Sequence, residues 1–138
     1  MISEAAHVHP TDATGSFRRR ILIVDDEPEL VRAVTLRLSQ AGYDTMSASD
    51  GAAATEMAFN EPPDLVLLDI GLPNHDGYQV ASMLRAADRT AHVPIVFLTA
   101  RTWDLDKARS VRPDGYVVKP YQPDELLDIV GRLTAARE

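Results

Sequence analysis

The sequence predicts an α/β fold in which helices cover both faces of a parallel sheet. Residues 21–24, 65–68 and 93–98 are runs without polar residues, as is typical of strands buried on both faces. Segments with helical spacing of apolar residues separate the runs. Buried strands alternating with helices form βαβ units, which wind right-handed into one sheet. We therefore predict a doubly wound (βα)5 domain with a five-stranded parallel sheet.

Length, charge and composition limit the number of domains and exclude several classes of function. The chain has 138 residues, 45% of them hydrophobic, which suits one domain rather than two. A formal charge of −7 argues against direct nucleic-acid binding, which requires a basic face. The absence of cysteine excludes disulfides and thiolate metal sites. No apolar run approaches the roughly 20 residues of a membrane span, so we expect a cytoplasmic protein without membrane contact.

The first half of the chain contains two strand and helix pairs. Residues 1–19 lack periodicity and are predicted to be a flexible leader to a domain at 20–138. A strand at 21–24 stops at Asp25 and Asp26.

Helix signals follow the first strand. Pro28 suits the first turn of a helix and Gly42 its end. Residues 43–48 are less apolar, as expected for a strand at the sheet edge. Asp50 then opens an Ala-rich helix that reaches about Phe59.

The third strand, 65–69, ends in an acid. Asp69 precedes a Gly/Pro turn, and Asp76 can cap the next helix. The apolar face predicted for that helix consists of Val80, Met83, Leu84 and Ala87. The fourth strand, 93–98, leads to Thr99.

The last third of the chain contains two helices around a short strand. A brief helix is predicted with Leu105, Ala108 and Val111 on one side, followed by a turn at 113–115. Residues 116–118 form the fifth strand, which ends at Lys119. The final helix, Pro123 to about Ala136, has an apolar face of Leu126, Leu127, Val130 and Leu133. Because the chain ends with this helix, we expect no output domain.

Polar residues stand at four strand ends: Asp25, Asp26, Asp69, Thr99 and Lys119. The carboxyl ends of parallel strands meet at one edge of the sheet, where such folds bind ligands. Three carboxylates repel one another, and Mg²⁺ prefers such oxygen ligands. A lysine and a hydroxyl suit phosphoryl oxygens, and Asp is a known phosphoryl acceptor.

The motifs at these strand ends resemble the receiver domains of two-component response regulators (the CheY-like family). The similarity extends over about residues 20–136 and rests on the motifs at 24–28, 68–73, 98–100 and 116–120, in that order. Each motif alone is weak, but the four together are specific. The resemblance implies the strand order 2-1-3-4-5.

The resemblance also implies a site and a partner. Asp69 would accept a phosphoryl group from a sensor histidine kinase or a histidine phosphotransfer protein. Asp26 and Asp69 would ligate Mg²⁺, for which Mn²⁺ can substitute. Asp25 would act mainly through water, and the backbone carbonyl of Gly71 would complete the protein ligands.

A switch is implied as well. Lys119 and Thr99 would contact phosphoryl oxygens, with a cis bond between Lys119 and Pro120. Movement of Thr99 would leave room for Tyr116 to swing inward. The face built from the fourth helix, fifth strand and fifth helix would then bind an unknown downstream protein. Such a domain is no enzyme beyond catalysing its own phosphorylation and dephosphorylation.

Two departures from the family pattern affect these expectations. The segment between Thr99 and Lys119 is short, and residues 113–115 replace a more familiar Gly-Ala run, so we expect a short, shifted or partly unwound fourth helix. Gly71 and Arg101 occupy positions that tune acyl-phosphate lifetime in the family.

Other functions remain open at this stage. A phosphoryl shuttle would use the same chemistry, and the chain could be part of a longer regulator. Haloacid-dehalogenase-type phosphatases also use a strand-end Asp, but they carry a second Asp where this chain has Gly71. Taken singly, Asp25 and Asp26 are equally compatible with turn residues or a helix cap, and Tyr116 with a half-buried packing aromatic.

Overall fold

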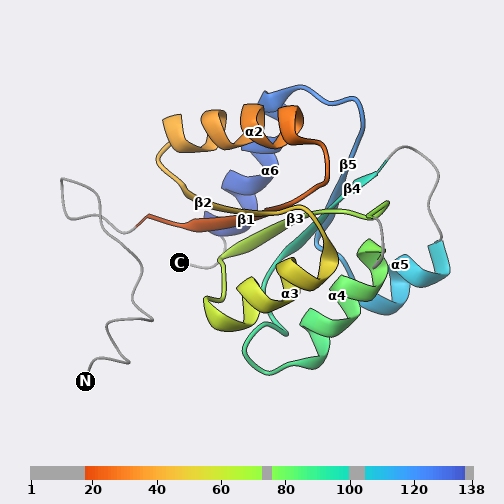
Figure 1. Ribbon diagram of the computed structural model, residues 1–138. Coiled ribbons are helices and arrows are strands. Elements are labelled where there is room, and N and C mark those ends of the chain that lie inside the picture. Colours follow the sequence, from red (N-terminus) through yellow and green to blue (C-terminus); the bar gives the residue numbers. More distant parts are fainter. Residues whose placement is uncertain (1–17, 73–75, 100–104, 136–138) are drawn as a thin grey trace, which may run out of the picture.

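A computed structural model describes residues 18–72, 76–99 and 105–135 (Figure 1). Most of the predicted leader lies outside these residues, as does Arg101. Within the described chain a five-stranded parallel sheet has the order β2-β1-β3-β4-β5. Its strands are β1 (Arg20–Val24), β2 (Asp44–Ala48), β3 (Leu65–Asp69), β4 (Ile95–Thr99) and β5 (Gly115–Val118). The predicted fold class and strand order are confirmed.

The helices form a layer on each face of the sheet (Figure 1). They are α2 (Pro28–Gln40), α3 (Gly51–Asn60), α4 (Gly77–Ala86), α5 (Leu105–Val111) and α6 (Pro123–Ala135). Helices α2 and α6 cover one face, and α3, α4 and α5 cover the other. None of the helices in the described ranges is long and apolar enough to cross a membrane.

The central strands are buried on both sides, which explains their uninterrupted apolar runs. Along β3, Leu68 packs into the core under α3, α4 and α5, whereas Leu67 packs into the core under α2 and α6. Along β4, Phe97 and Leu98 divide in the same way. Successive side chains of a strand point to opposite faces, so every residue of these strands enters one core or the other.

The helix boundaries follow the capping residues identified in the sequence. The Asp50 Oδ1 accepts a hydrogen bond from the Ala53 N–H at 2.8 Å, and the Asp76 Oδ1 accepts one from the Gln79 N–H at 2.9 Å. Gly42 follows α2 with φ +98°, a left-handed conformation that other residues adopt only with strain. These short-range signals were sufficient to place α2, α3 and α4.

The predicted apolar face of α4 was wrong at Met83, which is 44% exposed. The buried face consists of Gly77, Val80, Ala81 and Leu84. The small residues Gly77 and Ala81 allow α4 to approach the sheet closely, and this orientation turns Met83 outward. In α6 the structure buries Ile129, which the predicted face omitted, while Leu127 and Leu133 are only partly buried.

The sequence led us to expect a short, shifted or partly unwound fourth helix, and α5 has 7 residues in the part of the chain that the structure describes. Arg85, in the last turn of α4, holds the C-terminal end of α5. Its guanidinium donates hydrogen bonds to the carbonyls of Val111 at 3.1 Å and Arg112 at 2.9 Å. The Arg85 guanidinium also contacts the Asp114 carboxylate at 2.9 Å, which in turn accepts from the Ile95 N–H at 2.8 Å. The unusual 113–115 turn is therefore an anchored junction between α5 and β5.

Gly77 is where α4 lies against the end of β3. A Cβ added there would lie 2.6 Å from the Asp69 carbonyl oxygen and in contact with the Ile70 Cα. We predict that Gly77→Ala lowers the free energy of unfolding by about 1–3 kcal/mol, as overpacking does. Urea unfolding followed by circular dichroism measures this loss.

Gly131→Ala is the matched control. Gly131 lies within α6, and a Cβ there would meet only the Tyr43 hydroxyl, at 3.8 Å. Alanine is the better helix former by roughly 0.5–1 kcal/mol, so this variant should be as stable as the wild type or more so. Equal losses in both variants would contradict the close contact at Gly77.

Candidate functional site

The predicted strand-end residues converge at the carboxyl edge of the sheet. Asp25 and Asp26 follow β1, Asp69 ends β3, Thr99 ends β4 and Lys119 follows β5. Oxygens of the Asp25, Asp26 and Asp69 carboxylates lie within 4.8 Å of one another. The sheet order puts β1, β3 and β4 side by side, and the ends of neighbouring strands are within side-chain reach.

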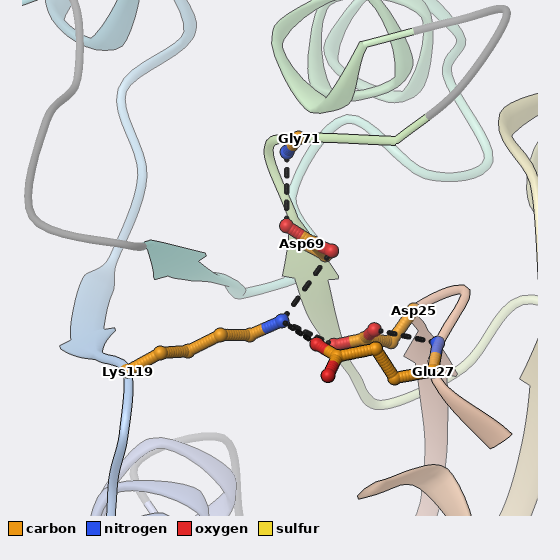
Figure 2. Close-up of polar contacts among 5 residues, drawn as sticks. All are labelled: Asp25, Glu27, Asp69, Gly71 and Lys119. Atoms are coloured by element: carbon orange, nitrogen blue, oxygen red, sulfur yellow. Dashed lines mark hydrogen bonds and ion pairs between the residues drawn. The ribbon is translucent and has the colours of Figure 1, made fainter.

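Lys119 reaches across this edge to three carboxylates (Figure 2). Its Nζ lies 2.9 Å from the Asp25 Oδ2, 3.0 Å from the Glu27 Oε1 and 3.4 Å from the Asp69 Oδ2. The backbone of Lys119 is held as well, because its N–H donates to the Thr99 carbonyl at 2.6 Å. The Lys119-Pro120 bond is cis, as predicted.

The charges at the site shift two pKa values. Burial raises the pKa of the Asp25 carboxyl above its usual range, although hydrogen bonds from Lys119 and the Glu27 N–H favour its ionised form. Burial alone would lower the pKa of Lys119, but its contacts with Asp25 and Glu27 and the charge of Asp69 raise it above its usual range. Lys119 is therefore a permanent cation among acids.

Asp69 is only 9% exposed, and its two carboxylate oxygens have different surroundings. Oδ1 accepts a hydrogen bond from the Gly71 N–H at 2.9 Å, whereas Oδ2 faces Lys119 (Figure 2). The Gly71 amide thus orients the Asp69 carboxylate. The predicted use of the Gly71 carbonyl as a metal ligand stays a prediction.

Thr99 carries a buried polar atom that has no partner in the described part of the chain. The residue is 1% exposed, and its Oγ1 makes no hydrogen bond within the described chain. A buried hydroxyl without a partner is costly, and such atoms are rare in native proteins. The Thr99 hydroxyl is therefore available for a ligand at the carboxyl edge.

Tyr116 lies on β5 beside Phe97 of β4 and is 55% exposed. Its interpretation as a half-buried packing aromatic was wrong, because β5 is an edge strand and this side chain faces outward. The inward movement expected of Tyr116 stays a prediction.

Sequence reasoning missed two residues of this region. Glu27 contacts Lys119, and the Tyr121 hydroxyl is buried with no hydrogen-bond partner in the described ranges. The pKa of the Tyr121 hydroxyl responds to the charged groups of the site. It is raised by burial and by the charges of Asp25, Glu27 and Asp69 and lowered by that of Lys119, so the hydroxyl lies near the acids. Glu27 directly follows Asp26, and Tyr121 lies two positions after Lys119, so proximity along the chain was the available signal.

The arrangement fits a hard divalent cation. The grouped side chains offer carboxylate oxygens from Asp25, Asp26 and Asp69, the donor type that Mg²⁺ prefers. Asp26 is exposed, whereas Asp25 and Asp69 are nearly buried, so one side of the group is open to solvent. That open side leaves room for waters and for an oxygen of a second ligand.

A family model described as the response regulator receiver domain matches residues 21–131. Curated relatives include the transcriptional regulatory protein KdpE of Mycobacterium tuberculosis, 40% identical over 86% of this chain and 54% of its own length. The DNA-binding response regulator MtrA of Mycolicibacterium smegmatis is 42% identical over 81% of this chain and 49% of its own length. The chain thus spans about half the length of these relatives.

Solved structures give the same picture. The receiver domain of the sensor histidine kinase PA1611 of Pseudomonas aeruginosa is 30% identical with a TM-score of 0.79, covering 86% of this chain and 98% of that one. That structure holds a magnesium ion in its active-site cleft. The chemotaxis protein CheY4 of Vibrio cholerae is 28% identical with a TM-score of 0.79, covering 84% of this chain and 98% of that one.

Tyr121 allows a test of the surroundings of the site. Burial raises the pKa of the Tyr121 hydroxyl to about 12, so the folded state keeps a proton that the unfolded state loses near pH 10. Stability therefore falls as the pH rises between these two values. We predict that Tyr121→Phe matches or exceeds wild-type stability at pH 7, since the lost hydroxyl has no partner among the residues described, and that it loses less stability near pH 11.

Urea unfolding at both pH values measures these differences. The pH 7 measurement serves as the internal control for packing, because the phenyl ring is retained. A loss of more than about 1 kcal/mol at pH 7 would show that the hydroxyl makes a hydrogen bond after all.

Proposed function

The chain belongs to the response regulator receiver family, and on that premise we propose that Asp69 accepts a phosphoryl group from a phosphohistidine. The donor is a sensor histidine kinase or a histidine phosphotransfer protein. The main support for the proposal is the position of Asp69 close to a lysine and to two other carboxylates. Its Oδ2 lies 3.4 Å from the Lys119 Nζ, beside two further acids.

The Asp69 carboxylate is the nucleophile of the proposed transfer. An Oδ–P bond forms as the P–N bond to the donor imidazole breaks, and the electron pair stays on that nitrogen, which takes up a proton. The Gly71 N–H holds the Oδ1 of Asp69, so Oδ2 is the attacking atom. Lys119 and the Thr99 hydroxyl then bind oxygens of the transferred group.

Asp25, Asp26 and Asp69 are proposed to hold Mg²⁺ or Mn²⁺, with the Gly71 carbonyl as a further ligand. The ion supplies positive charge that offsets the negative charge of the carboxylates and of the phosphoryl oxygens. The chain's own residues provide the nucleophile and the orientation.

The output is proposed to be a change on the face of α5, β5 and α6. A phosphoryl group adds a charge of about −1.5 to −2 beside the buried Thr99. Thr99 moves toward it, and Tyr116 turns into the space that it leaves. Tyr116 and Val118, both exposed on β5, belong to the surface that a downstream protein would read.

The domain is proposed to act in the cytoplasm as a switch, not as an enzyme on a separate substrate. The relative named as a DNA-binding response regulator is matched over only 49% of its own length, so its binding to DNA is not carried over to this chain. Direct contact of these 138 residues with nucleic acid is not proposed.

Incubation with Mg²⁺ and acetyl phosphate tests the phosphoryl acceptor. We predict that the wild type gains one phosphoryl group by intact mass and that Asp69→Ala gains none, because the nucleophilic oxygen is gone. Asp88→Ala removes an exposed carboxylate and is the matched control, expected to behave as the wild type. An equal adduct on Asp69→Ala, or none on the wild type, would reject the proposal.

Metal binding is tested without phosphorylation. An ion that binds only the folded state raises its stability, by about 2.7 kcal/mol at a concentration 100 times its Kd. We predict that Mg²⁺ raises the Tm of the wild type over a sodium control of equal ionic strength. Asp26→Asn should abolish this rise and Asp88→Asn should retain it. A rise that persists in Asp26→Asn would remove Asp26 from the ligands.

A further inference from the structure

Glu27 stands in the N-cap position of α2, but its side chain makes no capping hydrogen bond within the described residues. Ser, Thr, Asp and Asn are preferred there because their short side chains reach the first free amides of the helix. The Glu27 carboxylate instead lies 3.0 Å from the Lys119 Nζ (Figure 2). A residue poorly suited to capping is thus engaged with the lysine of the site.

The backbone of Glu27 is fixed on both sides. Its N–H donates to the Asp25 Oδ1 at 3.0 Å, and its carbonyl accepts from the Val31 N–H at 3.0 Å. Pro28 follows, and a residue before proline is restricted to extended backbone, as the ψ of 103° at Glu27 shows. The contact with Lys119 therefore arises from a constrained position and not from a mobile loop residue.

All three N–H donors of the Lys119 ammonium group are engaged by carboxylates. An ammonium group has three donors, and the Lys119 Nζ contacts three carboxylates, those of Asp25, Glu27 and Asp69. A phosphoryl oxygen at Asp69 can receive a hydrogen bond from Lys119 only if one of these contacts is given up.

Glu27 is the partner that can leave at the lowest cost. The Glu27 side chain is 62% exposed, compared with 1% for Asp25 and 12% for Asp69. Water replaces the lysine around an exposed carboxylate, whereas a buried carboxylate stripped of its cation has no such compensation. Asp25 and Asp69 are also the nearly buried members of the carboxylate group.

We propose that Glu27 is a positioning residue for Lys119, which holds one donor of the ammonium until a phosphoryl oxygen at Asp69 displaces it. The proposal rests on the proposed function of Asp69 and Lys119. It adds no covalent step, because the Glu27–Lys119 ion pair breaks and a Lys119–phosphoryl pair forms. Phosphorylation is then slower than it would be with Lys119 free of Glu27.

Two substitutions separate the ion pair from the charge. Glu27→Gln removes the charge and weakens the bond, while Glu27→Asp keeps the charge on a side chain one methylene shorter. Glu29→Gln is the matched control, because Glu29 is an exposed acid in the first turn of the same helix. All four proteins are compared at saturating Mg²⁺ over a range of acetyl phosphate concentrations, with the adduct followed by quenched-flow mass spectrometry.

We expect Glu27→Gln to raise the phosphorylation rate constant about two- to fivefold, the scale of one exposed ion pair. Glu27→Asp should raise it in the same direction by a smaller factor, and Glu29→Gln should leave it unchanged. Unchanged or slower reaction in Glu27→Gln would overturn the inference. So would acceleration in Glu27→Gln and Glu29→Gln without acceleration in Glu27→Asp, because charge alone would then explain it.

A readout independent of phosphoryl transfer is the NMR signal of the Lys119 side-chain Cε. The chemical shift of this signal should change in Glu27→Gln and not in Glu29→Gln. A purely structural effect on α2 would not produce that difference between the two variants. Adduct formation at equal rates in all four proteins would overturn only the role of Glu27. A wild type that forms no adduct, even with the expected Cε shift, would overturn the proposed function and the inference that rests on it.

Discussion

The contact between one ammonium and three carboxylates at the carboxyl edge of the sheet is the interaction on which the site depends. Asp25 and Asp69 are nearly buried and close together, and two such charges repel strongly where water is scarce. Lys119 offsets them from the end of β5, two strands away from β3. A cation in this place makes the acid cluster compatible with folding, and it leaves enough negative charge to attract a metal ion.

The same residues connect the site to the packing of the domain. The Asp69 carbonyl is covered by the first residue of α4, and the Lys119 N–H is bonded to the end of β4. The residues around the Asp69 carboxylate are therefore connected to α4 and to β4. Thr99, whose buried hydroxyl has no partner in the described chain, is the last residue of β4.

The short α5 gives this chain its own version of the output region. Arg85 binds the end of α5 and the turn before β5, at the edge of the sheet opposite the site. Its side chain is only 12% exposed, so its hydrogen bonds are well shielded. The junction of α5 and β5 is thus held by Arg85, and Tyr116 and Val118 are exposed on the strand that follows it.

The sequence by itself determined the strands, their parallel arrangement and the helix starts, because apolar runs and caps such as Asp50 and Asp76 act over a few residues. It also identified the acids, Thr99 and Lys119, since strand ends are visible in the chain. Tertiary structure alone decided that Met83 is exposed and that Glu27 binds Lys119. Both depend on how elements distant in sequence pack together. The depth of a helix against a sheet and the reach of a side chain across strand ends are not encoded in any local pattern.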